Sequence, residues 1–171
     1  MNIFYLHKDA KIAGQMHCNK HVVKMILEYG QILSTTYRLR HQYTKENGMI
    51  KFIPLSDKFD NLYKMAFVNH PSTIWARQSL QHYTWLYELF CTLCDEYTYR
   101  YGKTHVTDTK LRGILKEPPQ FIEDNGFVDP PQCMFEEYKC DDTVQAYRNY
   151  YLGAKRSFLD YTRREKPEWI L

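Results

Sequence analysis

The sequence predicts an all-α, or mainly α, fold: a compact single-domain helical bundle with long loops, covering residues 1–171. Three observations predict it. Apolar residues recur at three- and four-residue spacing over most of the chain, which is the period of a helix with one buried face. No stretch longer than residues 3–6 alternates apolar and polar side chains as a half-buried strand does. The 171 residues, 44% of them hydrophobic, suffice for one packed core.

The first predicted element is a long helix over residues 9–39, a periodic segment without proline. Gly14 and Gly30 weaken a helix at these positions without ending it. Residues 40–56 are mainly polar and contain Asn47-Gly48, a pair typical of turns. The sequence therefore predicts a loop after the first helix.

Two further helices are predicted in the middle of the chain. A short one is expected over Ser56–Phe67, with the serine as its N-cap, and residues 69–72 (Asn-His-Pro-Ser) mark a break and a fresh helix start. An apolar stripe predicts a long helix over Thr73–Tyr101, with a bend near Gln81. Gly102 is expected to end this helix in the left-handed conformation that glycine adopts easily.

The last third of the chain alternates helices with a long loop. Residues 104–116 predict another short helix. Residues 117–141 are expected to form a loop, because two proline pairs prevent regular structure there. Asp142 or Thr143 is suited to cap a final helix that runs to about Arg164.

Composition excludes several classes of protein. The 7 Gly and 7 Pro are too few for a collagen-like or low-complexity chain. No apolar run approaches the roughly 18 residues of a membrane span, and residues 1–8 lack the features of a signal peptide. The five Cys are an odd number without the spacing of a disulfide framework. We therefore expect a reduced, cytoplasmic protein without a membrane partner.

The net charge of +3 is unevenly distributed along the chain. Residues 1–53 carry 8 Lys and Arg against 3 Asp and Glu, and residues 144–166 carry 6 against 2. Basic ends around a less charged middle suit a polyanion such as nucleic acid. Two solvated helix faces would give the same pattern, so charge alone leaves both interpretations open.

Five polar side chains fall on one narrow strip of the first predicted helix. At about 100° per residue, they lie within an arc of about 80°. They are His17, His21, Lys24, Glu28 and Gln31. Because apolar residues fill nearly all the rest, the helix is expected to be largely buried, with its strip lining a cleft and forming an acid–base constellation. The alternative is a Lys24–Glu28 ion pair that keeps one exposed face soluble.

A zinc site is the main competing interpretation of the same residues. His17 and His21 share a helix face, and Cys91 and Cys94 have the spacing of a metal-binding pair. The two Cys lie inside a predicted helix, however, where buried free thiols are the more usual finding. We therefore predict neither a metal nor another cofactor.

The residues of this helix carry a resemblance to a known family. Residues 20–28, Lys-His-Val-Val-Lys-Met-Ile-Leu-Glu, resemble the catalytic helix of the pyrimidine-dimer DNA glycosylases, the bacteriophage endonuclease V family. His21 and Glu28 match that helix's His and catalytic Glu. A second stretch, from His70-Pro71 to the Arg-Tyr-Gly-Lys-Thr-His of residues 100–105, is similar to the family's middle region. The whole chain also resembles proteins of large tailed phages, which implies the cytoplasm of an infected bacterial cell.

The resemblance implies a compact all-α fold and a monomer that acts on double-stranded DNA. The reaction implied is that of a glycosylase and lyase on damaged or modified pyrimidines. An α-amino group attacks the sugar C1′ and forms a Schiff base, while Glu28 stabilises the sugar cation and assists β-elimination. An α-amine is partly neutral at neutral pH and needs no metal for this attack.

Two departures from the family pattern affect this expectation. The family nucleophile is the amine of residue 2, exposed by removal of Met1, but here residue 2 is Asn, before which Met is poorly removed. Either Met1 supplies the amine or the lyase step is missing. The family also places Arg beside the catalytic Glu, where this chain has Leu27 and Gln31.

The candidate residues fall into three groups. The catalytic candidates are Met1, Asn2, His21 and Glu28. The DNA-binding candidates are Lys20, Lys24, Arg77, Lys103, His105, Arg148, Arg156, Arg163 and Arg164. The substrate-pocket candidates are His17, Gln31, His70 and Trp75. Two other functions stay open: a non-catalytic nucleic-acid-binding viral protein, and an enzyme that modifies nucleotides or bases on the same fold.

Overall fold

A computed structural model describes residues 1–39, 43–47, 49–52 and 61–170. The helices are α1 (Ala10–Gln15), α2 (Asn19–Leu39), α3 (Pro71–Gln78), α4 (Leu80–Tyr101), α5 (Val106–Leu115) and α6 (Thr143–Ala154). The short elements are the 3₁₀ turns η2 (Glu136–Tyr138) and η3 (Arg156–Phe158) and the strands β1 (Tyr43–Glu46) and β2 (Met49–Phe52). The prediction of a mainly α fold is confirmed.

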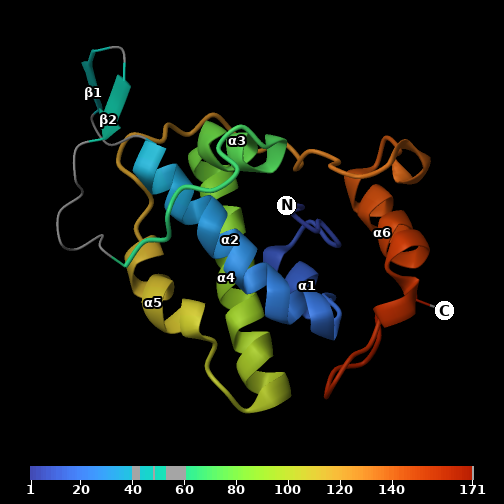
Figure 1. Cartoon of the computed structure of the whole chain (residues 1–171). Helices are drawn as coiled ribbons and strands as arrows, with labels where there is room; N and C mark the ends of the chain where they lie inside the picture. Colours follow the sequence, from blue (N-terminus) through green and yellow to red (C-terminus); the bar gives the residue numbers. More distant parts are fainter. Residues whose placement is uncertain (40–42, 48, 53–60, 171) are drawn as a thin grey trace.

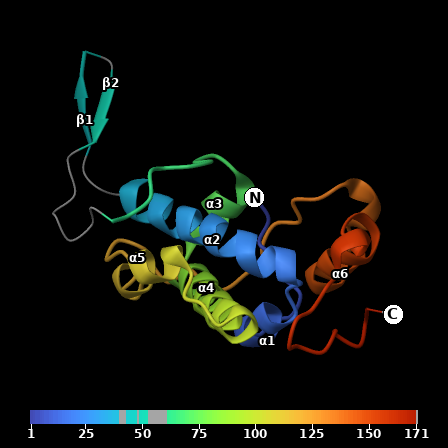
Figure 2. The same cartoon turned by 60° about the horizontal axis from the view of Figure 1, so that its bottom comes forward.

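Helices α2 and α4 run next to each other through the centre of the molecule (Figure 1). Helix α1 packs along α4, α5 packs mainly on α2, and α3 contacts both central helices. Helix α6 lies to one side, and the amino terminus lies between α3 and α6 in both views (Figures 1 and 2). None of the described helices combines the length and the apolar character needed to cross a membrane.

The first predicted helix is interrupted between α1 and α2. Arg100, on α4, donates hydrogen bonds to the carbonyl oxygens of Gln15 and His17, at 3.1 and 2.8 Å. These bonds satisfy carbonyl groups that a continuous helix would have used itself. Close packing fixes the position of α1, because a Cβ on Gly14 would lie 2.5 Å from Cγ2 of Thr92 on α4. The prediction of one helix over residues 9–39 is therefore wrong at residues 16–18.

The segment between α2 and α3 differs from both sequence-based predictions. Residues 43–46 pair with residues 49–52 in an antiparallel hairpin, where a loop was predicted. The predicted helix over Ser56–Phe67 is wrong for residues 61–67, which form no helix; residues 53–60 lie outside the described part. The carbonyl oxygens of this segment are satisfied from α2 instead, because Arg38 donates to those of Leu62 and Tyr63.

Local capping signals placed the helices of the middle region well. Helix α3 begins after His70, and its break from α4 falls at Ser79, two residues before the predicted bend. Gly102 ends α4 with φ of 66°, the left-handed conformation that was expected. Helix α5 lies within the predicted range and is capped by His105.

Helix α6 starts as predicted but ends ten residues early. Asp142 caps it through the N–H of Gln145, and the helix stops at Ala154 instead of Arg164. The following tail turns back to the start of α2, where the N–H of Asn19 donates to the carbonyl of Asp160 at 2.8 Å. The first N–H groups of a helix have no acceptor within the helix. The carbonyl of Asp160 is the acceptor for one of them.

Candidate active site and nucleic-acid surface

The amino-terminal segment is tied to α2 by a buried chain of hydrogen bonds. The N–H of Phe4 donates to Oη of Tyr29 at 3.1 Å, and Tyr29 is 3.3 Å from Nε2 of His17. The other ring nitrogen of His17, Nδ1, lies 2.7 Å from the carbonyl oxygen of Ala13 and must donate to it. Nε2 therefore accepts from Tyr29. Each group in this series of hydrogen bonds has a partner. The series therefore fixes the course of the first residues.

Met1 lies at the start of α3, where Oγ of Ser72 donates to its carbonyl oxygen at 3.3 Å. His70 belongs to the same group of residues. Burial lowers the pKa of His70, the positive charge of the amino terminus lowers it further, and the carboxylate of Glu28 acts in the opposite direction. The charges of the amine and of Glu28 thus both act on the ring of His70. We call Met1, Glu28 and His70 the amino-terminal centre.

Glu28 occupies the middle of α2, one turn after Lys24. The Lys24 ammonium lies 3.2 Å from its carboxylate, and the two side chains are 63% and 16% exposed. The ion pair of the alternative interpretation is thus present. Glu28 is the more sheltered of the two partners, and Lys24 is the more exposed.

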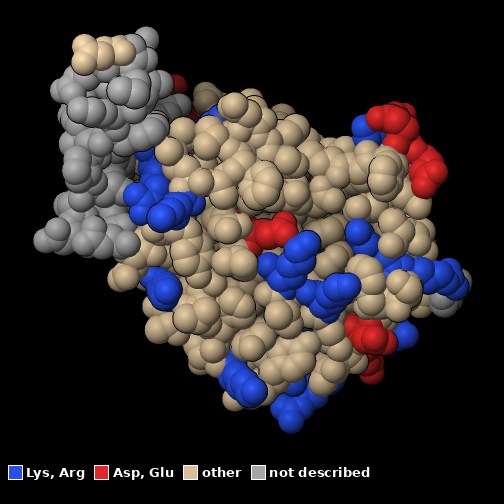
Figure 3. All heavy atoms as spheres, viewed as in Figure 1, with Lys and Arg blue, Asp and Glu red and all other residues tan. Residues whose placement is uncertain are grey.

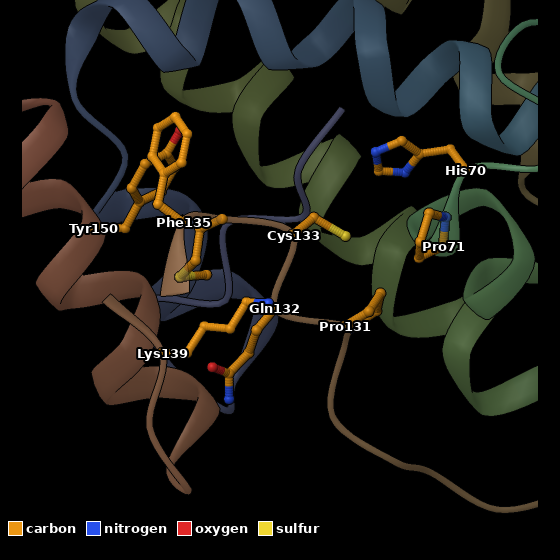
Figure 4. Close-up of a pocket in the computed structure, with 9 residues that line it drawn as sticks. His70, Pro71, Pro131, Gln132, Cys133, Phe135, Lys139 and Tyr150 are labelled. Carbon is orange, nitrogen blue, oxygen red and sulfur yellow. The ribbon is translucent and has the colours of Figure 1, made fainter. Parts of the chain in front are cut away.

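A pocket of about 500 Å³ adjoins the amino-terminal centre. His70 and Pro71 form one side of it, and the segment after Pro131 forms the other, with Tyr150 of α6 (Figure 4). The remaining lining residues are Gln132, Cys133, Met134, Phe135 and Lys139. Oγ of Ser72 links the two features, since it lies 3.6 Å from Sγ of Cys133 and also contacts Met1. The walls are mostly apolar or aromatic, as expected of a site for a flat organic ring.

Three lysines gather around the first turn of α2. Lys155, Lys24 and Lys20 each help to lower the pKa of His21 through their charge. Nζ of Lys20 lies 4.4 Å from the ring centre of Phe158, and Nζ of Lys155 lies 4.6 Å from that of Tyr150. We call these three lysines the α2 basic surface. Figure 3 shows Lys and Arg side chains around an acidic patch on the face that α2 presents.

His17 and His21 do not line a cleft, contrary to the prediction. They are 0% and 5% exposed, and His21 stacks on Phe4 with ring centres 4.2 Å apart. Nδ1 of His21 shares a hydrogen bond of 2.6 Å with Oη of Tyr151. Burial is the main cause that lowers the pKa of His17 to about 4 and that of His21 to about 2. Both rings are therefore neutral members of the core.

The exposed face of α2 is also less polar than predicted. Val23 and Leu27 are 43% and 42% exposed, on the same side as Lys24. Gln31 is half-buried on the turn after Glu28. The helix is therefore not wrapped by apolar contacts, and its outer face combines apolar and basic side chains next to the amino-terminal centre.

Several basic candidates also have partners within the fold. Arg164 forms an ion pair with the buried carboxylate of Glu96. Arg148 donates to the carbonyl of Leu6 at 3.1 Å, and its guanidinium lies 5.3 Å from the ring of Trp169. These contacts attach the C-terminal part of the chain to the core, and phosphate binding by the two arginines stays a prediction.

The remaining basic candidates are spread over the molecule. Arg163 donates to the carbonyl of Tyr99, and Arg77 donates to that of Val68. Arg156 is exposed in η3. Lys103 is exposed, and His105 half-buried, at the turn between α4 and α5. That turn is well separated from the amino terminus in both cartoon views.

Trp75 is a core residue and does not face the pocket beside His70. Its side chain is buried, Nε1 donates to the carbonyl of Val128 at 2.9 Å, and the ring stacks on His82. No three His, Cys, Asp or Glu side chains within the described ranges are grouped so that they could hold a metal. Cys91 and Cys94 are free thiols on α4, and burial raises the pKa of both.

Sequence reasoning did not select the far wall of the pocket or Lys155. Cys133 and Phe135 lie in a segment predicted only as a loop, and Lys155 was counted among the basic C-terminal residues without a role. Their position depends on the packing of residues 131–150 beside the amino terminus. The signal in the sequence was an aromatic side chain, Phe135, within a loop that contains two proline pairs.

A model of the pyrimidine dimer DNA glycosylase family matches residues 1–109, which include α1 to α4 and the amino-terminal centre. No curated protein and no solved structure matches the chain. The far wall of the pocket and Lys155 lie beyond the matched residues.

Proposed function

Because the chain belongs to the pyrimidine dimer DNA glycosylase family, we propose that it excises damaged pyrimidines from double-stranded DNA through its α-amino group. The observation that supports this most is that Ser72 contacts both Met1 and His70, and that the charges of the amine and of Glu28 both act on the His70 ring. A nucleophilic amine and a carboxylate are the two groups that a Schiff-base excision requires.

The reaction proceeds in two steps. The neutral amine attacks C1′, the glycosidic bond breaks, and the base leaves with the electron pair while Glu28 stabilises the positive charge on the sugar. Loss of the amine proton and opening of the ring give the Schiff base. In the lyase step Glu28 takes a proton from C2′, and the C3′–O bond breaks to release the 3′ phosphate.

Binding is assigned to the outer face of α2. The α2 basic surface supplies positive charge for phosphates, which contribute much of the affinity of any DNA-binding protein. Val23 and Leu27 supply apolar contacts of the kind that separate base steps and open a path to C1′. We propose that double-stranded DNA lies across this face and that the protein binds it as a monomer.

UV-irradiated duplex and borohydride test the proposal. The protein should form a covalent adduct, and Glu28→Gln should lose at least about 100-fold in excision rate while it keeps its affinity for the duplex. Glu88→Gln is the matched control, because Glu88 is a more exposed helical carboxylate that pairs only with Lys11 among the described residues. Absence of both adduct and strand cleavage with the unaltered protein would overturn the function.

Two further outcomes distinguish the alternatives. Salt-dependent binding that is equal for the unaltered protein and Glu28→Gln, without excision, would indicate a non-catalytic nucleic-acid-binding protein. Tight binding of a mononucleotide without affinity for duplex would indicate an enzyme of free nucleotides. The intact mass of the natural protein shows whether Met1 or Asn2 supplies the amine.

A further inference from the structure

Two histidines of this chain cap helices in the same way. Nδ1 of His70 accepts from the N–H of Ser72 at 3.1 Å, and Nδ1 of His105 accepts from the N–H of Thr107 at 3.1 Å. A neutral ring that accepts at Nδ1 carries its proton on Nε2. Each cap therefore defines the tautomer and points an Nε2–H group away from its helix.

The surroundings of the two rings differ. The ring of His105 packs edge-on against Tyr97, 5.0 Å between ring centres, at the turn between α4 and α5. The ring of His70 extends toward the wall that carries Cys133 and Phe135 (Figure 4). No described atom accepts a hydrogen bond from its Nε2. A residue that only caps a helix does not need a hydrogen-bond donor in a pocket. The Nε2–H group of His70 is such a donor, beside the amine and Glu28.

The environment of His70 also keeps its ring uncharged. Burial and the positive amino terminus both lower its pKa, and the N-terminus of α3 disfavours a positive charge at the same place. A neutral His70 ring cannot replace the amine as the cation of the site. It also does not repel the positive charge of that amine. It is a fixed hydrogen-bond donor at neutral pH.

We propose that His70 is a catalytic residue of the excision step and that its Nε2–H donates to a carbonyl oxygen of the departing pyrimidine. This inference rests on the proposed function. As the C1′–N1 bond breaks, the electron pair stays on N1 and spreads to the neighbouring carbonyl oxygen. A donor already in place stabilises that charge, and no proton has to move. The apolar and aromatic walls opposite His70 favour a base over a phosphate as the group that enters.

The variants His70→Asn and Asp142→Asn separate catalysis from capping, because both side chains cap a helix and Asp142 belongs to none of the candidate groups. Asn is a good N-cap, so its side-chain oxygen takes over the capping bond in both variants. We expect both to keep the urea midpoint of unfolding and the affinity for UV-irradiated duplex. In single turnover, His70→Asn should excise at least about 100-fold more slowly, and Asp142→Asn at the unaltered rate.

A duplex with an abasic site provides the decisive readout, because it reaches the Schiff base without the departure of a base. His70→Asn should be trapped on this substrate as fast as the unaltered protein. Equal slowing on both substrates would mean that His70 acts on the amine and not on the departing base, which would overturn the inference. An unchanged rate on the damaged duplex would overturn it as well. Failure of the unaltered protein to be trapped on either substrate would instead refute the proposed function.

Discussion

The backbone N–H of Phe4 and the phenol oxygen of Tyr29 form a buried hydrogen bond of 3.1 Å between residues 25 positions apart. Tyr29 follows Glu28 directly on α2. The bond therefore connects the first residues of the chain to the helix that carries the candidate carboxylate.

Tyr29→Phe should weaken both stability and excision. The change leaves the Phe4 N–H and Nε2 of His17 without their partner in a buried place, at a cost of about 1–3 kcal/mol in the free energy of unfolding. Because the amino-terminal segment loses an anchor, the rate of adduct formation should fall while the affinity for DNA stays nearly constant.

Tyr83→Phe is the control for that variant. Tyr83 is equally buried and donates to the carbonyl of Leu115, in the contact between α4 and the end of α5. It should lose comparable stability in urea titrations and keep the rate of adduct formation. An equal loss of rate in both variants would show that stability alone limits the activity.

Removal of the lysines of the α2 basic surface should change the salt dependence of binding. Each of Lys20→Gln, Lys24→Gln and Lys155→Gln should reduce the slope of log K against log salt by about 1 if that lysine contacts a phosphate. Fluorescence anisotropy with a labelled duplex measures the slope. Lys110→Gln, an exposed position on α5, should leave it unchanged, and an effect there as large as at Lys155 would indicate that DNA binds elsewhere.

Stability should decrease as the pH falls below about 6.5, because two buried histidines stay neutral in the fold. His17 and His21 have pKa values of about 4 and about 2, so only the unfolded chain takes up their protons between pH 6.5 and 4. Each should contribute a loss of about 1.4 kcal/mol per pH unit in this window.

His21→Phe tests this dependence in urea titrations from pH 7 to 4. The variant keeps an aromatic ring against Phe4 and should show a slope shallower by about 1.4 kcal/mol per pH unit. Tyr151→Phe removes the partner of His21 but no titrating ring, so it should lower stability without changing the slope. A slope that His21→Phe leaves unaltered would mean that the ring is protonated in the fold.

Glu96→Gln should be the most destabilising of the charge-removing variants. Its carboxylate pairs with Arg100, whose side chain is 0% exposed, and with Arg164, which is 31% exposed. Leaving Arg100 without its counter-ion should cost about 3–5 kcal/mol. Arg164→Gln should cost about 1 kcal/mol or less, because its guanidinium is partly in water. Thermal unfolding compares the two, and equal losses would contradict the assigned burial.

Features that depend on neighbouring residues could be predicted from the sequence. Helical periodicity indicated the helical class, and the break at residues 69–72, Gly102 and Asp142 placed helix boundaries, because each acts within one turn. Residues 20–28 and the region from His70 to His105 pointed to the family, since motifs of this kind are local too. Glu28 was selected as a candidate in the same way.

Tertiary structure decided what depends on residues far apart. Arg100, which lies on α4, satisfies the carbonyl groups at the end of α1. The hydrogen bond between Asn19 and Asp160 turns the C-terminal tail back to α2. The periodicity of the sequence reveals neither of these long-range contacts. His17 and His21 match a polar strip in sequence, yet rings from α6 and the amino-terminal segment bury them. The pocket beside His70 exists only because residues 131–150 pack there. Periodicity predicts which face of a helix is buried. It does not predict which distant residues cover that face, because these are brought there only by the tertiary fold.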